Sequence, residues 1–158
     1  MAQPTPHGGN GFAMDITSKA IIEQLQQDGR RSYASIGKAV GLSEAAVRQR
    51  VQKLVDARVM QVVAVTDPLQ LGFTRQAMIG LRSDGDMVAT ADRVSALDAV
   101  DYCLVVAGSF DIMAEVVCAS DDDLLHIINE IRNIDGVRET ETFLYLSLRK
   151  QEYNWGTR

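Results

Sequence analysis

The sequence is poor in the residues that carry most enzyme and metal chemistry. It holds only two histidines, His7 and His126, and two cysteines, Cys103 and Cys118. None of them has metal-ligand spacing, and no nucleophile–base order or phosphate-binding glycine loop accompanies them. We therefore predict no catalytic site, no metal site and no cofactor, which disfavours an enzyme or an enzyme's regulatory subunit. The cysteines are expected to be reduced and buried in strands.

Long apolar runs are also missing. No run approaches the roughly 18 residues needed to span a bilayer. Residues 1–14 lack the basic start and apolar centre of a signal peptide and are rich in proline and glycine. We expect a flexible arm there, no membrane contact and a cytoplasmic protein. The length of 158 residues, with 46% apolar and 23% charged residues, suits one large or two small globular domains.

The stretch around which the chain is organised is 32–54, where two short helical patterns flank a Gly-Leu-Ser corner at 41–43. Ser32 and Ser43 are good N-caps, and Gly41 stands where a left-handed residue ends a helix. Apolar residues share one face of each helix: Ile36, Ala39 and Val40 in the first, and Val47, Val51, Leu54 and Val55 in the second. Two helices joined by such a corner indicate a helix-turn-helix.

The second of these helices carries the chemistry that a recognition helix needs. Small residues allow close approach to a groove, amide and guanidinium groups read base edges, and cations contact phosphates. The predicted DNA-binding residues are Ser43, Glu44, Ala45, Ala46, Arg48, Gln49, Arg50 and Lys53. The alternative is an ordinary amphipathic helix whose polar face is merely solvated. The preceding helix and corner favour the DNA interpretation.

The net charge of −5 is distributed unevenly along the chain. Residues 1–60 hold eight Lys and Arg against five acids, a charge of +3, whereas 61–158 hold eight against sixteen, a charge of −8. The basic part coincides with the helix-turn-helix, where phosphates would be contacted. Because +3 is modest, we expect DNA to be bound by a dimer.

The remaining elements follow in order. Asp15 is expected to cap a helix to Gln27 that buries Ile21, Ile22 and Leu25, completing a three-helix unit. The β-branched stretch 60–68 predicts a strand, either a wing or a hinge, and 69–74 a linker. After it, strands at 77–81, 102–107, 112–118 and 137–148 and helices at 87–97 and 120–136 give the order β-α-β-β-α-β of a ferredoxin-like unit.

The last strand has bulky apolar residues on both faces. Thr140, Thr142, Leu144, Leu146 and Leu148 point one way, and Glu141, Phe143, Tyr145, Ser147 and Arg149 the other. Helices cover only one face of such a sheet, so the other face must pack on another subunit. We therefore expect an obligate dimer through this domain.

Together these parts resemble the Lrp/AsnC family of bacterial and archaeal transcription regulators. The resemblance runs from Asp15 to about Arg149. It rests on I-I-x-x-L at 21–25, D-G-R at 28–30, V-G-L-S at 40–43, V-x-x-R-V-x-K-L at 47–54, G-S-F-D at 108–111, G-V at 136–137 and T-x-T at 140–142. It implies an α+β protein: a winged helix-turn-helix domain at 15–59, a hinge and linker at 60–75, a ferredoxin-like effector domain at 76–150 and a tail at 151–158.

The resemblance also implies an effector site and higher assembly. In this family the second domain senses small molecules, typically amino acids, between dimers that assemble into octamers or similar discs. The implied effector residues are Tyr102, Gly108, Ser109, Phe110, Asp111, Thr140 and Thr142. Asp111 could bind an α-ammonium group, or it could simply cap backbone N–H groups in a hairpin turn. Tyr102 could line the same pocket, but an aromatic residue in a strand more often belongs to a core.

The chain departs from the family pattern at three positions. Ser18 replaces a second aspartate of the first helix, Lys53 replaces an arginine, and Ser35 replaces a glutamate that would complete a capping box. None removes the recognition surface. The function expected is a sequence-specific, nucleoid-associated transcriptional regulator controlled by an amino acid. The alternative is an architectural, chromatin-like protein that binds DNA with little sequence preference.

Overall fold

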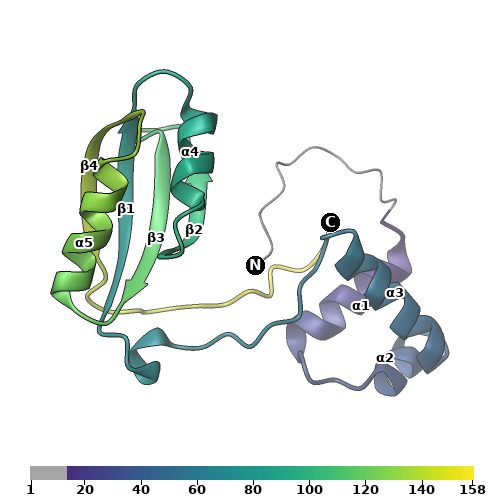
Figure 1. Ribbon diagram of the computed structural model, residues 1–158. Helices are drawn as coiled ribbons and strands as arrows, with labels where there is room; N and C mark the ends of the chain where they lie inside the picture. Colours follow the sequence, from purple (N-terminus) through teal and green to yellow (C-terminus); the bar gives the residue numbers. More distant parts are fainter. Residues whose placement is uncertain (1–13) are drawn as a thin grey trace. The chain divides into compact units, whose positions relative to one another are not determined.

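The computed structural model describes residues 14–158, so the expected arm at 1–14 lies outside the described residues except for Met14. The chain forms two compact units (Figure 1). One reaches Ala64 and includes Lys150–Arg158, and the other is Val65–Arg149. The expected hinge at 60–75 is therefore divided between the units after Ala64, and the expected tail belongs with the first unit.

The first unit is a three-helix domain of α1 (Ile16–Gln27), α2 (Tyr33–Val40) and α3 (Glu44–Asp56). Each helix has the cap predicted for it: the side chains of Asp15, Ser32 and Ser43 each accept a backbone N–H three residues later, at 2.7, 3.2 and 3.2 Å. Capping satisfies a backbone donor that the helix itself leaves unpaired. The core is formed by Ile21, Ile36, Val47 and Val51.

The buried face of α2 differs at one point from the face that the apolar residues predict. Ala39, expected on the buried face, is exposed, whereas Gly37 is buried. The reason is that the corner folds back onto the other flank of α2: the Leu42 N–H donates to the Gly37 carbonyl at 2.9 Å. A Cβ at Gly37 would lie 2.5 Å from the Leu42 carbonyl oxygen, so only glycine fits there. Gly41, at φ +74°, ends α2 in the left-handed conformation as predicted.

The strand expected at 60–68 does not form. Residues 60–67 have no regular structure, and they are followed by a short 3-10 helix, Pro68–Leu71. A strand exists only where a neighbouring backbone accepts and donates its hydrogen bonds. Within the described residues, 14–158, no strand pairs with 60–67, and Val62, Val63 and Val65 are more than half exposed.

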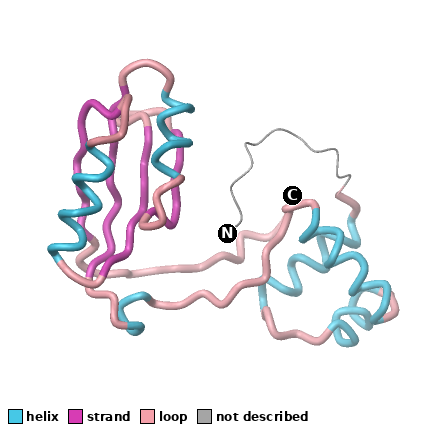
Figure 2. The backbone as a smooth tube through the Cα atoms, viewed as in Figure 1, coloured by secondary structure: helices cyan, strands magenta, loops and turns pink. Residues whose placement is uncertain are grey.

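The second unit has the predicted β-α-β-β-α-β order (Figure 2). Its elements are β1 (Arg75–Ser83), α4 (Met87–Ser95), β2 (Val100–Val105), β3 (Ile112–Cys118), α5 (Asp121–Arg132) and β4 (Val137–Leu144). The strands form one antiparallel sheet in the order β2-β3-β1-β4, with β2 and β3 as the expected hairpin. Cys103 on β2 is half-buried and Cys118 on β3 is buried, and both are free thiols.

Both helices of this unit pack on the same face of the sheet. The core joins Ala77, Ile79 and Leu81 of β1 and the inward residues of β3 to residues such as Val94 of α4 and Ile131 of α5. The opposite strand positions, including Met78 and Gly80 of β1, therefore face away from the helices. The ring of Phe110 covers Gly80 and meets Phe143 edge-on, with 5.8 Å between ring centroids.

The last strand ends earlier than predicted. It stops at Leu144, and only the Tyr145 N–H continues the ladder, by donating to the Gln76 carbonyl at 2.8 Å. Its partner β1 begins at Arg75, so the ladder between the two strands ends beside Tyr145. Leu146 and Leu148 are consequently exposed, at 91% and 54%.

The close approach at Gly37 leads to a stability prediction. We expect Gly37→Ala to lower the free energy of unfolding by about 1–3 kcal/mol, because the new methyl group would collide with backbone atoms of the corner. Denaturant unfolding measures this. Gly108→Ala is the matched control, since a Cβ at Gly108 meets nothing within 4 Å. Equal stability of the two variants would contradict this account of the corner.

Candidate DNA-binding and effector sites

The outer face of α3 presents most of the residues predicted to contact DNA. Ala45, Arg48, Gln49 and Lys53 are exposed, as are the cap Ser43 and the first helical residue Glu44, while Ala46 is half-buried. The helix is anchored from behind by Val47, Val51 and Leu54. The structure adds Gln52, an exposed amide on the same face that donates to Asp56 Oδ1 at 2.8 Å. The helical period alone could have identified it, because it lies one turn beyond Arg48.

Arg48 stands at the edge of this face between two partners. Its Nη2 lies 2.6 Å from Glu44 Oε1, and its guanidinium carbon lies 5.3 Å from the centroid of the Tyr33 ring. The arginine side chain is still 64% exposed. An exposed i,i+4 ion pair contributes little stability, so exchanging the carboxylate for a phosphate or a base edge costs little. The tyrosine ring meanwhile limits where the guanidinium can point.

Arg50, also predicted to contact DNA, has its partners at another helix. It points to the start of α1, where its Nη1 donates to Asp15 Oδ2 at 2.6 Å and to Ser18 Oγ at 3.1 Å. The Ser18 backbone N–H and the Arg50 guanidinium hold the pKa of Asp15 at about 2 instead of 3.8. Ser18, one of the departures from the family pattern, thus accepts a bond from Arg50. The structural role of Arg50 is to fasten α3 to α1.

The 108–111 loop is organised by Asp111. Its backbone N–H donates to the Leu81 carbonyl at 2.9 Å, and its Oδ2 accepts the Ser83 N–H at 2.8 Å. The carboxylate therefore caps a backbone donor, the simpler of the two roles considered from the sequence. Gly108 and Ser109 are exposed, and the Ser109 carbonyl accepts from Arg82 Nε at 3.0 Å. This loop stands at the end of the β2–β3 hairpin.

The other residues implied for the effector site lie apart from one another within one chain. Tyr102 is on β2 and the two threonines are on β4, the opposite edges of the sheet. Thr140 and Thr142 are opposite Leu81 and Ile79, so they share the helix-covered face, and Thr140 Oγ1 accepts from Arg132 Nε at 2.9 Å. Phe110 lies over Gly80 on the other face. One chain does not gather these residues into one pocket.

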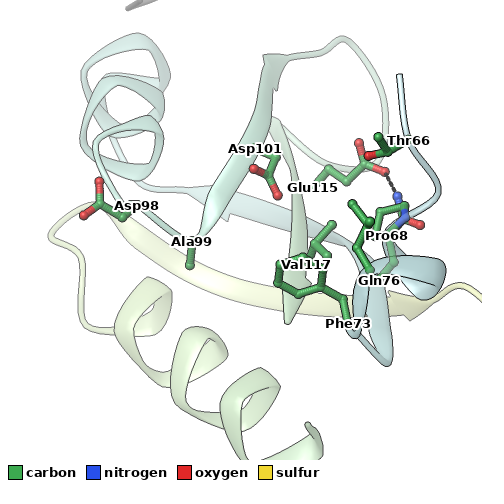
Figure 3. Close-up of a pocket in the computed structure, with 10 residues that line it drawn as sticks. Thr66, Pro68, Phe73, Gln76, Asp98, Ala99, Asp101, Glu115 and Val117 are labelled. Carbon is green, nitrogen blue, oxygen red and sulfur yellow. Dashed lines mark hydrogen bonds between the residues drawn. The ribbon is translucent and has the colours of Figure 1, made fainter. Parts of the chain in front are cut away.

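The second unit does contain a pocket, of about 420 Å³, at another place (Figure 3). None of the implied effector residues lines it. Its walls come from the segment before β1 and from β1, β2 and β3, and the lining residues are Thr66, Pro68, Leu71, Phe73, Gln76, Asp98, Ala99, Asp101, Glu115 and Val117. Burial and the charge of Glu115 raise the pKa of Asp101. The Gln76 amide donates to Glu115 Oε1 at 2.9 Å.

Among residues 14–158, none of the helices combines the length and the hydrophobicity that a membrane-spanning segment requires. Within the same range, no three His, Cys, Asp or Glu side chains are grouped so that they could hold a metal ion.

Comparison with known proteins identifies both units. Residues 14–55 match the AsnC-type helix-turn-helix domain, and residues 76–155 match the Lrp/AsnC ligand-binding domain. The regulatory protein AsnC of Escherichia coli is 31% identical over 139 residues, which cover 85% of this chain and 91% of AsnC.

Solved structures agree with this match. The leucine response regulatory protein of Mycobacterium tuberculosis superposes with a TM-score of 0.77 at 25% identity, covering 87% of this chain and 96% of that one. A regulator of Neisseria meningitidis in complex with L-Met superposes with a TM-score of 0.73 over 89% of this chain and 95% of its own, at 22% identity, which shows the fold alone.

Proposed function

The chain belongs to the Lrp/AsnC family of transcriptional regulators, and we propose that its dimers read specific operators through α3 under the control of an amino acid. The observation that carries the proposal is the pairing of two units: a helix-turn-helix with an exposed face of amides and cations, and a ligand-binding domain that follows it. Its place of action would be the DNA of the nucleoid. The two parts of the proposal, reading DNA and sensing an amino acid, are tested separately below.

For DNA contact we propose the exposed residues of α3 and its cap. Ala45 and Ala46 leave room for the helix in the major groove, Arg48 and Gln49 reach base edges, and Lys53 neutralises a phosphate. Ser43 and Glu44 stand at the helix N-terminus, which approaches the backbone of the DNA first. Arg50 contributes by fixing α3 on α1 through Asp15, so its contact with a phosphate would require that pair to open.

We propose that the dimer forms through the sheet face that the helices leave uncovered. In the described part of the second unit, this face carries Tyr102, Leu104, Phe143 and Tyr145, each between 37% and 53% exposed. An apolar surface of this kind is normally buried against a partner. Two copies related by a two-fold axis would bury it symmetrically and would present two α3 helices to successive half-sites of an operator.

For the effector we propose an amino acid held at the 108–111 loop and the threonines of β4, contributed by different copies. The regulator of Neisseria meningitidis was solved with L-Met, which supports this chemical class. Because Tyr102 and the threonines lie at opposite edges of one sheet, a site that uses all of them needs more than one chain. That requirement supports assembly of dimers into an octamer or a similar disc, with the ligand favouring one arrangement.

Arg48 gives the test of DNA recognition. We expect Arg48→Ala to weaken binding to the DNA upstream of the protein's own gene by roughly tenfold or more, about 1–3 kcal/mol, because a guanidinium contact to a base or phosphate is lost. Fluorescence anisotropy across a salt series measures the Kd. Arg138→Ala is the matched control, since Arg138 pairs with Asp84 on the surface of the other unit.

An unchanged Kd for Arg48→Ala would remove Arg48 from the contact surface. Wild-type binding that competitor DNA abolishes equally at every sequence would instead indicate the architectural protein with little sequence preference.

Leu104 gives the test of the dimer. We expect Leu104→Asp to convert the dimer into monomers, because a carboxylate would be buried in the interface without a partner. Sedimentation velocity measures the mass. Leu125→Asp is the control, since Leu125 is 58% exposed on α5, away from the uncovered face, and should stay dimeric. A monomeric wild type, or a dimeric Leu104→Asp, would contradict the proposed interface.

Asp111 gives the test of the effector site. Asp111→Asn keeps an oxygen that can accept the Ser83 N–H but loses the charge that an α-ammonium group requires. We expect this variant to bind DNA normally and to lose its response to each of the twenty L-amino acids at millimolar concentration. Asp122→Asn, on the first turn of α5, serves as the control. A full response in Asp111→Asn would leave Asp111 only its loop-capping role.

A further inference from the structure

The end of the chain lies along α1 in the DNA-binding unit, not with the domain that precedes it. Residues Lys150–Arg158 belong to the same compact unit as α1, α2 and α3, and the C-terminus lies beside these helices (Figure 1). The family's ligand-binding domain accounts for residues 76–155, so Gly156, Thr157 and Arg158 lie beyond the part that matches it. These three residues make the contacts with α1.

Each of the three terminal residues has its own polar partner on the helix. The Gly156 N–H donates to Gln26 Oε1 at 3.2 Å, and Thr157 Oγ1 donates to Glu23 Oε1 at 2.5 Å. Lys19 Nζ donates to the Arg158 carbonyl oxygen. The tail therefore runs antiparallel to α1, and its last residue lies nearest the start of the helix.

The geometry on both sides suits this contact. Lys19, Glu23 and Gln26 are spaced by four and three residues, which places their side chains in one row along the helix. On the tail, Gly156 has φ +75°, a conformation that glycine adopts without strain. Gly156 and Thr157 are half-buried, whereas the preceding Trp155 is 79% exposed and touches Tyr153 of the tail itself.

The tail is the direct continuation of the last strand of the effector domain. β4 ends at Leu144, Tyr145 makes the last bond to β1, and Lys150 follows five residues later. The DNA-binding unit is thus joined to the effector domain at two points of the chain, after Ala64 and before Lys150. In addition, α1 is fastened to the recognition helix, because Asp15 pairs with Arg50 at 2.6 Å.

We propose that the row Lys19–Glu23–Gln26 on α1 is a docking site for the chain's own C-terminal residues 156–158. The docked tail is a second connection that restrains α1, and through Asp15 and Arg50 also α3, relative to the last strand of the effector domain. This inference rests on the proposed function only for its effect on DNA. The docking itself is independent of it.

The experiment compares the full chain with a chain that ends at Trp155. Amide hydrogen exchange over residues 16–27 reports the docking, and we expect severalfold faster exchange in the shortened chain. Binding to the DNA upstream of the protein's own gene reports the restraint. We expect a Kd that is roughly two- to fivefold higher, because the loosened unit must be ordered again on binding.

Two further variants test whether the effect comes from the contact between the tail and α1. Glu23→Ala removes the partner of Thr157 from the helix side and should reproduce part of the faster exchange. Glu152→Ala removes only the Lys150–Glu152 ion pair within the tail, at 3.1 Å, and should behave as the full chain does.

Unchanged exchange in the shortened chain would overturn the docking, and faster exchange with an unchanged Kd would overturn the restraint. A full chain that binds no DNA would refute the proposed function, while the exchange measurement would still decide the docking.

Discussion

The constraint on which most of this structure depends is that a strand must have a neighbouring backbone and an apolar face must have a cover. β1 has both, because β3 and β4 flank it and the helices α4 and α5 cover one side. Residues 60–67 pair with no strand in the described part of the chain and are largely exposed, so this β-branched stretch stays without regular structure. β4 likewise ends at Leu144, which pairs with Ala77 near the first residue of β1. The sheet face that the helices leave uncovered is the observation that supports the proposed dimer.

The DNA-binding unit depends on a different and more local interaction. The ion pair between Asp15 and Arg50 joins the cap of α1 to the middle of α3, and Ser18 adds a second acceptor for the same guanidinium. This frees Arg48, Gln49 and Lys53 to face outward while α3 is held from behind. Arg50, which the sequence predicts to contact DNA, is paired with Asp15 and Ser18 of α1 in the fold.

In the ligand-binding domain, one chain does not bring together the residues proposed for the effector. Asp111 is used to order its loop, and the threonines of β4 lie across the sheet from Tyr102. The pocket that a single chain does form has other walls, with Asp101 and Glu115 among them. Ligand recognition at the implied residues would therefore be a property of the assembly, which fits a regulator whose ligand acts by changing how copies meet.

The helices, their caps and the β-α-β-β-α-β order follow from local patterns in the sequence, because capping residues, glycine turns and apolar periodicity are local signals. Ser32, Gly41 and Ser43 mark the helix-turn-helix without any knowledge of distant residues. Other features of the fold depend on tertiary contacts. Only it shows that Gly37 rather than Ala39 faces the corner, that Arg50 pairs with Asp15 thirty-five residues away, and that the C-terminus returns to α1. Each of these depends on which segments meet in space, and a local pattern does not record that.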